Sequence, residues 1–403
     1  MIAVALLAQD SVLAPEILLL SRAKTHMVGS LKNQPNYTCL ETIERSKREG
    51  RRKKFELIDV LRLEVALVGG KEHFAWPGSK KFEDTEIGDL VPAGGAIGSG
   101  IFASHAHAIF VGNVAGFHFE GFSEDGKTAK FHFTVPQGFS GYVVKNGRGD
   151  QATVAYHGSF RIDKELQRVT RIEVEADDIP VRVEIKSATN SMDYGDIRIG
   201  ERDYWLPVSA SLKIENLLTP SEFTNAIRFS GCRQFSGEST LSFGDAPADL
   251  HPEPVKQEIV KIPKDTTLTI SLDRELDQAE LATGDAIEAR LAGAVKHRGI
   301  EYFPKGARVE GHIVLLRNIP GGSTAVIRFE RIVDRNGDGN RSSVLNAVPD
   351  AQTPNVSPRI GSAASQRSLS GSAKTPGEAT ISTRGGPLHL PKGFRITWVT
   401  LEP

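Results

Sequence analysis

The clearest alternation of apolar and polar residues lies at 156–179, which reads YHGSFRIDKELQRVTRIEVEADDI. In its second half, Ile172 and Val174 alternate with Arg171 and Glu173. A period of two places these two sets on opposite faces of a strand, one buried and one solvated. Because a short polar turn precedes this strand and another strand precedes the turn, the pattern predicts an antiparallel hairpin.

The segment 14–31 carries apolar residues at spacings of three and four, which is the pattern of an amphipathic helix. These residues are Ile17, Leu18, Ala23, Met27, Val28 and Leu31. Pro35 and Asn36 follow and are expected to end the helix. We expect the helix to lie across a sheet.

Alternating segments at short intervals predict a series of antiparallel strands in the first part of the chain. They lie at 37–43, 57–68, 117–122, 129–135, 141–144, 153–162, 169–176, 181–190, 192–199, 204–215 and 221–235. The edges of such a sheet need closure or cover. The predicted fold is therefore mainly β: a strongly curved antiparallel sheet, or half-barrel, packed on the N-terminal helix. A short helix at 101–110 is expected over one sheet edge, as a lid or rim.

The concave face of this sheet is the predicted ligand-binding surface. Its apolar residues are expected to be Leu63, Val65, Phe119, Phe133, Ile172 and Val174. The face is either a packed core or a hydrophobic cavity, and the alternation is the same in both cases.

The hairpin at 160–175 also resembles a known family. Its aromatic-x-Ile-Asp, polar turn and Arg-x-x-Arg-Ile-Glu-x-Glu are similar to the hairpin of bacterial outer-membrane lipoprotein carriers, the LolA-like fold. The resemblance implies a periplasmic protein that shelters an acyl chain, with a lipid or a lipidated protein as partner.

The length of 403 residues favours two domains. We expect the curved-sheet domain at 11–245, a Pro-rich linker at 246–258 and a second domain at 259–403. In the second domain, alternating strands are expected at 267–272, 286–292, 307–316, 325–333 and 394–401. A segment rich in Ser, Ala, Gly, Thr and Pro at about 350–386 is expected to be a flexible insertion.

Turns of the type apolar-Pro-Lys recur in this second domain, at 262–264, 303–305 and 390–392. Together with TGDAIEARL at 283–291 they resemble the small β-barrel of TrbI-like conjugation and secretion-channel proteins. The resemblance implies a C-terminal β-barrel that contacts an envelope partner.

The N-terminus has an apolar run at 2–8 followed by small and polar residues. We interpret 1–10 as the end of a secretory signal that begins upstream of Met1; the alternative is a short apolar lead into the first helix. An exported protein with two cysteines suggests one disulfide, Cys39–Cys232, worth about 4–5 kcal/mol in the chain-entropy model. The alternative is two buried thiols. The predicted location is periplasmic or secreted.

A basic run occupies the predicted turn at 44–56, with its patch formed by Arg48, Arg51, Arg52, Lys53 and Lys54. Such a run can attract anionic lipid headgroups or a polyanion, at about 1 kcal/mol per residue. The alternative is a solvated hairpin tip. The net charge of −1 gives no global signal for nucleic acid, and no apolar stretch approaches the length of a membrane span.

Candidate chemistry is sparse. The chain has no Gly-x-Ser-x-Gly, P-loop or dinucleotide fingerprint, so we expect neither an enzyme nor a cofactor. His105 and His107 are two positions apart and point away from each other on a helix, and the calcium-loop-like segment at 334–340 has Leu345 where Glu is required, so no metal is expected. The leading hypothesis is a non-catalytic cell-envelope protein that binds an acyl chain or apolar segment on its concave face. The alternatives are a structural interaction module with a filled core and, third, a hydrolase.

Overall fold

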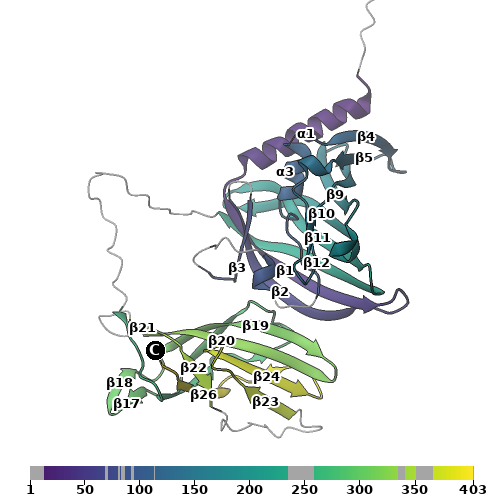
Figure 1. Cartoon of the computed structure of the whole chain (residues 1–403). Helices are drawn as coiled ribbons and strands as arrows, with labels where there is room; N and C mark the ends of the chain where they lie inside the picture. Colours follow the sequence, from purple (N-terminus) through teal and green to yellow (C-terminus); the bar gives the residue numbers. More distant parts are fainter. Residues whose placement is uncertain are drawn as a thin grey trace, which may run out of the picture.

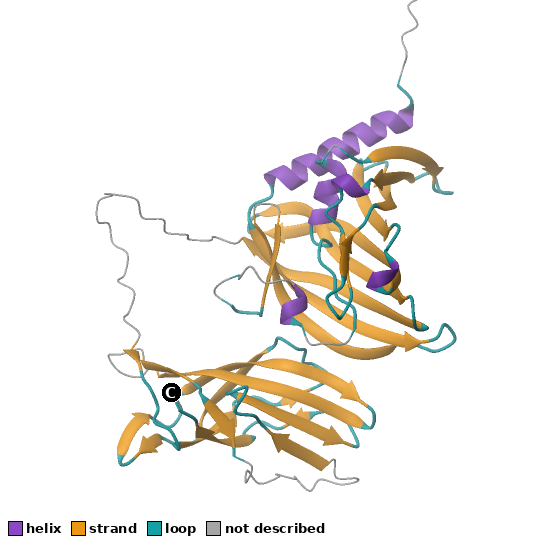
Figure 2. Cartoon of the chain, viewed as in Figure 1, coloured by secondary structure: helices purple, strands orange, loops and turns teal. Residues whose placement is uncertain are grey.

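The computed structural model describes residues 13–68, 71–79, 82, 87–91, 95–112, 114–234, 258–334, 341–350 and 366–402. Strands make up 57% of the structure and helices 11%, so the predicted mainly-β class is confirmed (Figures 1 and 2). The predicted signal segment at 1–10, nearly all of the predicted linker and the segment 335–340 lie outside the described residues.

The first unit begins with helix α1 (Pro15–Asn33), which has proline at its first turn and Lys32 in its last, both favourable placements. The elements that follow are β1 (Tyr37–Glu49), β2 (Glu56–Val68), β3 (Lys71–Ala75), α2 (Ile87–Leu90), α3 (Ser104–Phe110), β4 (Gly116–Phe122), β5 (Thr128–Val135), η1 (Gln137–Phe139), β6 (Val143–Lys145), β7 (Gln151–Thr153), β8 (Tyr156–Asp163), β9 (Arg168–Ala176), η2 (Val181–Val183), β10 (Ile185–Ile199), β11 (Arg202–Asn216) and β12 (Ser221–Gln234).

The strands of this unit form one antiparallel sheet in the order β3-β2-β1-β12-β11-β10-β9-β8-β5-β4. The predicted hairpin of 156–179 is β8 and β9, in the middle of the second half of this order. The sheet curves around a core that also contains buried residues of α1 and α3 (Figure 1). The expected half-barrel packed on the N-terminal helix is therefore confirmed.

The C-terminal unit is also built from short strands. They are β13 (Glu258–Ile259), β14 (Thr267–Leu272), β15 (Leu276–Asp277), β16 (Ala286–Leu291), β17 (Val295–His297), β18 (Ile300–Phe303), β19 (Arg308–Ile319), β20 (Gly322–Asp334), β21 (Arg341–Val344), β22 (Ala347–Pro349), β23 (Gln366–Ser370), β24 (Glu378–Arg384), β25 (His389–Leu390) and β26 (Arg395–Thr400). The main sheet runs β22-β26-β14-β16-β19-β20-β24-β23 around a separate core that includes Phe329 and Trp398. The described pairings do not close this sheet into a complete barrel.

Three local expectations are wrong. The segment at 350–386 is not wholly a flexible insertion, because β23 and β24 lie in it and β24 pairs along its length with β20. Thr is common in strands, and Ala379 and Ile381 supply the buried face of β24. The turn expected at 44–56 is shorter, since β1 continues to Glu49, and the two strands expected at 181–199 are a 3₁₀ turn followed by the single strand β10.

The short helix predicted within 101–110 is present, but it does not cover a sheet edge. Helix α3 and the residues before it are part of the main core of the first unit. Ala106 and Ile109 are completely buried, and Phe110 packs edge-on against Phe160 with 5.1 Å between ring centroids. The sequence 101–110 is apolar on more than one face, so the helix is stable only when it is surrounded by protein.

The two units contact each other where β2 meets β19 and the segment before β16. Thr283 donates its backbone N–H to Val60 and accepts one from Arg62, at 2.9 and 2.8 Å. Trp76 stacks on His312, with 5.5 Å between ring centroids. Backbone hydrogen bonds and a stacked ring pair therefore connect the two units through noncovalent contacts.

Candidate binding surfaces

The predicted concave-face residues do share one face of the curved sheet, but they are buried. Leu63, Val65, Ile172 and Val174 have no exposed surface, and Phe133 has 1%. Phe119 is only partly buried and packs against Phe122 and Phe131, with centroid distances of 5.0 and 5.2 Å. As described, the concave face is occupied by protein side chains.

Helix α3 and the residues just before it supply much of this filling. Phe102 lies between Tyr37 of β1 and Phe229 of β12, at centroid distances of 5.0 and 5.1 Å. Glu72 of β3 fixes the start of α3, because its carboxylate accepts the backbone N–H groups of Gly100 and Ala103 at 2.7 and 2.9 Å. The acidic side chain thus satisfies donors that would otherwise lack partners at the helix start.

A carboxyl group that the sequence analysis did not single out lies in this core. Glu41 is buried on the same face of β1 as Cys39 and Ile43. Burial, reinforced by the nearby charge of Glu72, raises the pKa of Glu41 from 4.5 to about 8. The sequence did hold a signal for this burial, because Glu41 is two positions from both Cys39 and Ile43 and so shares their face of the strand.

Two tyrosines contribute further buried polar groups. Burial raises the pKa of Tyr37 well above its ordinary value, with Tyr194 as the second cause, and burial also raises the pKa of Tyr194. Both hydroxyls and Glu41 Oε2 are buried without a hydrogen-bond partner among the described residues. Such groups usually bind a protein group or ordered water.

His105 is a core residue and His107 is exposed, so the two point apart as expected. Burial lowers the pKa of His105 to about 4, which keeps the imidazole neutral near pH 7. Asn190 Nδ2 lies 3.5 Å from His105 Nε2 and donates to the Tyr142 hydroxyl at 2.9 Å. Across the described part of the chain, no group of three or more His, Cys, Asp or Glu side chains is arranged to hold a metal ion.

A cavity of about 310 Å³ lies beside α1, at the rim of the sheet rather than in its centre. Its lining includes Met27, Ser30, Arg168, Val169, Tyr204 and Trp205. The Trp205 indole donates to the Val169 carbonyl at 2.8 Å, and the Arg168 guanidinium lies 5.0 Å from the Trp205 ring. This volume is at the lower limit for a small-molecule site, which is about 300 Å³.

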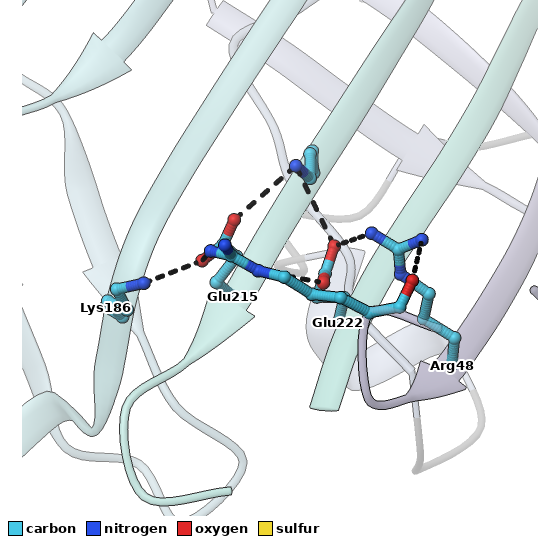
Figure 3. A network of polar contacts seen from close by, with 6 residues as sticks. Arg48, Lys186, Glu215 and Glu222 are labelled. Carbon is cyan, nitrogen blue, oxygen red and sulfur yellow. Dashed lines mark hydrogen bonds and ion pairs between the residues drawn. The ribbon is translucent and has the colours of Figure 1, made fainter. Parts of the chain in front are cut away.

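The predicted basic patch divides into two parts. Arg48 pairs with Glu222 at 2.6 Å, and Arg51 lies 3.5 Å from Glu215. Lys186 also pairs with Glu215, so the two carboxylates are surrounded by basic groups from β1, β10 and β11 (Figure 3). The other three residues of the patch are Arg52, Lys53 and Lys54, which are exposed in the turn between β1 and β2.

The predicted disulfide is confirmed. Cys39 of β1 and Cys232 of β12 are bonded, with 4.1 Å between their Cα atoms and a sequence separation of 193. Because β1 and β12 are neighbours in the sheet, the bond closes a loop that contains most of the curved-sheet unit.

No known protein-family profile matches this chain, and no curated protein sequence matches it. Of the helices in the described ranges, none is both long and apolar enough to cross a membrane. The carrier-like and channel-like resemblances of the two units stay predictions.

Proposed function

We propose that the protein is a non-catalytic cell-envelope interaction protein with a filled curved-sheet domain. The observation that carries this proposal is the complete burial of Leu63, Val65, Ile172 and Val174 in a core that also contains residues of α3. A cavity for an acyl chain would have to displace α3, whose start is held by the Glu72 carboxylate. The confirmed disulfide supports an oxidising compartment, either periplasmic or extracellular.

The C-terminal unit offers an edge for a protein partner. Ile259 on β13 and Val344 on β21 are 73% and 72% exposed, and the two short strands pair in parallel next to each other. Exposed apolar residues on a sheet edge are suited to a contact with a partner protein. This supports the expectation that the barrel-like unit meets an envelope partner.

Titration with a fluorescent fatty acid tests the filled core. We expect no saturable binding by the wild-type protein. A matched variant, Ala106→Gly, removes one buried methyl from α3 without adding a new group and should also show no binding. Saturable binding with one probe per chain would contradict the proposal.

A second function, an acyl carrier, is favoured by one observation. The rim cavity adjoins Met27 of α1, and the buried residues of α1 are only Leu19, Ala23 and Met27. If α1 moved, this cavity would extend toward the core. The same titration separates the two functions, because a carrier binds the probe and Met27→Trp, which fills the cavity, should then abolish binding.

A further inference from the structure

We propose that the end of the curved sheet away from α1 is a docking surface for an anionic lipid bilayer. The surface consists of the β1–β2 turn at 50–55 and the β11–β12 turn at 216–220, and we call it the tip surface. This proposal rests on the envelope function proposed above, and it identifies the lipid bilayer as one binding partner of the protein. It is independent of whether the concave face is filled.

The two turns of the tip surface are held together. Gly50 donates its backbone N–H to the Pro220 carbonyl at 2.8 Å, which joins the two turns. Leu217 donates to the Glu184 carbonyl at 2.9 Å, which joins the second turn to the start of β10. The β1–β2 hairpin projects at the end of the sheet away from α1 (Figure 1). Charge and apolar surface on the two turns are therefore presented at the same end of the domain.

The first component of the tip surface is positive charge. Arg52, Lys53 and Lys54 are exposed, and the charge of Lys53 acts on the carboxylate of Glu49. Behind them, two carboxylates are shared among four basic side chains, so this network also has an excess of positive charge (Figure 3). The acidic residues that flank this turn are Glu49, which pairs with Lys47, and the exposed Glu56.

The second component is apolar. Leu217 and Leu218 are 39% and 64% exposed at adjacent positions in the β11–β12 turn. The turn is fixed by Asn216, whose side-chain oxygen accepts the backbone N–H groups of Leu218 and Thr219 at 2.9 and 2.8 Å. Phe55 is also exposed and lies 4.6 Å from the Arg48 guanidinium.

Basic and apolar side chains at one end of a rigid unit match the chemistry of a bilayer surface. Anionic headgroups attract nearby Lys and Arg, and the apolar groups enter the boundary between headgroups and acyl chains. A soluble acidic protein would satisfy the charge but would not require two adjacent leucines on a fixed turn. We therefore assign the bilayer as the occupant.

Sedimentation with vesicles tests the assignment using the full chain. We expect binding to vesicles of phosphatidylcholine mixed with phosphatidylglycerol and little binding to phosphatidylcholine alone. The triple variant Arg52→Glu/Lys53→Glu/Lys54→Glu should weaken binding tenfold or more, and Leu217→Ser/Leu218→Ser should weaken it severalfold. Raised salt should weaken the wild type, because exposed charges are screened beyond about 10 Å at 0.1 M salt.

The control is Lys305→Glu/Lys374→Glu/Lys392→Glu, which makes the same change in charge at exposed positions of the C-terminal unit. It should bind as the wild type does. Equal loss in the control, or equal binding to both vesicle types, would overturn the proposal. Binding to soluble polyglutamate without binding to anionic vesicles would also overturn it, in favour of an acidic protein partner. None of these outcomes affects the fatty-acid titration.

Discussion

Arg317 of β19 donates from Nη2 to Asp59 Oδ2 of β2 at 3.2 Å, across the contact between the two units. Asp59 also accepts from Arg45 Nε and Nη2, both at 2.7 Å. The side chains of Asp59 and Arg45 are 0% and 1% exposed. One buried carboxylate thus connects the interior of the curved sheet with the C-terminal unit.

Replacement of Asp59 by Ala should destabilise the curved-sheet unit by about 3–5 kcal/mol, because it leaves the Arg45 charge buried without its carboxylate. Arg317→Ala should cost about 1 kcal/mol, since the Arg45 pair remains. Denaturant unfolding, followed by intrinsic fluorescence, measures both changes. The control is Arg290→Ala, which breaks an exposed pair with Asp273 and should have an effect of a few tenths of a kcal/mol. Equal effects of Asp59→Ala and Arg290→Ala would contradict this role.

Gly284 is expected to be essential for the contact between the units. A Cβ atom at this position would lie 2.2 Å from the Arg62 carbonyl oxygen and 2.8 Å from the Trp76 ring. Gly284→Ala should therefore cost at least about 2 kcal/mol more than Gly299→Ala. Gly299 is the matched control, because its φ of +84° is also positive but nothing lies within 4 Å of an added Cβ. Thermal unfolding checks the difference, and equal shifts in Tm for the two variants would refute it.

Removal of the disulfide, by Cys39→Ser/Cys232→Ser, should destabilise the curved-sheet unit by about 5 kcal/mol in the chain-entropy model for a loop of this length. The C-terminal unit has its own core and should unfold as before. Calorimetry of the double variant is expected to show one transition shifted to lower temperature and one unchanged. A shift of both transitions by the same amount would indicate a single cooperative unit instead.

Glu41 should make stability fall with pH. Its folded-state pKa of about 8 is above the ordinary 4.5, so the folded protein holds the proton more tightly than the unfolded chain. The stabilisation is fully present below pH 4.5, decreases by up to about 1.4 kcal/mol per pH unit between pH 4.5 and 8, and is lost above pH 8. Glu41→Gln should flatten this decrease in denaturant unfolding at a series of pH values. The control Glu44→Gln, on the opposite face of β1, should keep the wild-type slope; a wild-type slope in Glu41→Gln would disprove the assignment.

The sequence was sufficient for features that depend on local periodicity. Alternation correctly predicted that Leu63 and Val65 of β2, and Ile172 and Val174 of β9, lie on the buried face of the sheet. This is possible because successive side chains of a strand point to opposite faces. The same alternation could not decide between cavity and core. That outcome depends on α3, which packs on strands far from it in sequence.

Features that depend on distant partners were missed for the same reason. In the sequence, Asp59 is a single polar residue near the start of a predicted strand. Its partner Arg317 lies 258 positions away, so no local pattern connects the two. Strand β24 has few large apolar residues, and its pairing with β20 stabilises it through backbone hydrogen bonds that no side-chain pattern reveals. The basic run was visible, but its relation to Leu217 and Leu218 depends on two turns meeting in space.

The most direct test of the filled concave face is native mass spectrometry of the protein purified from its native cells, without organic extraction. We predict the mass of the polypeptide alone, with no lipid released on activation. A stoichiometric additional mass that dissociates as a fatty acid or phospholipid would contradict the filled core and establish the carrier function instead.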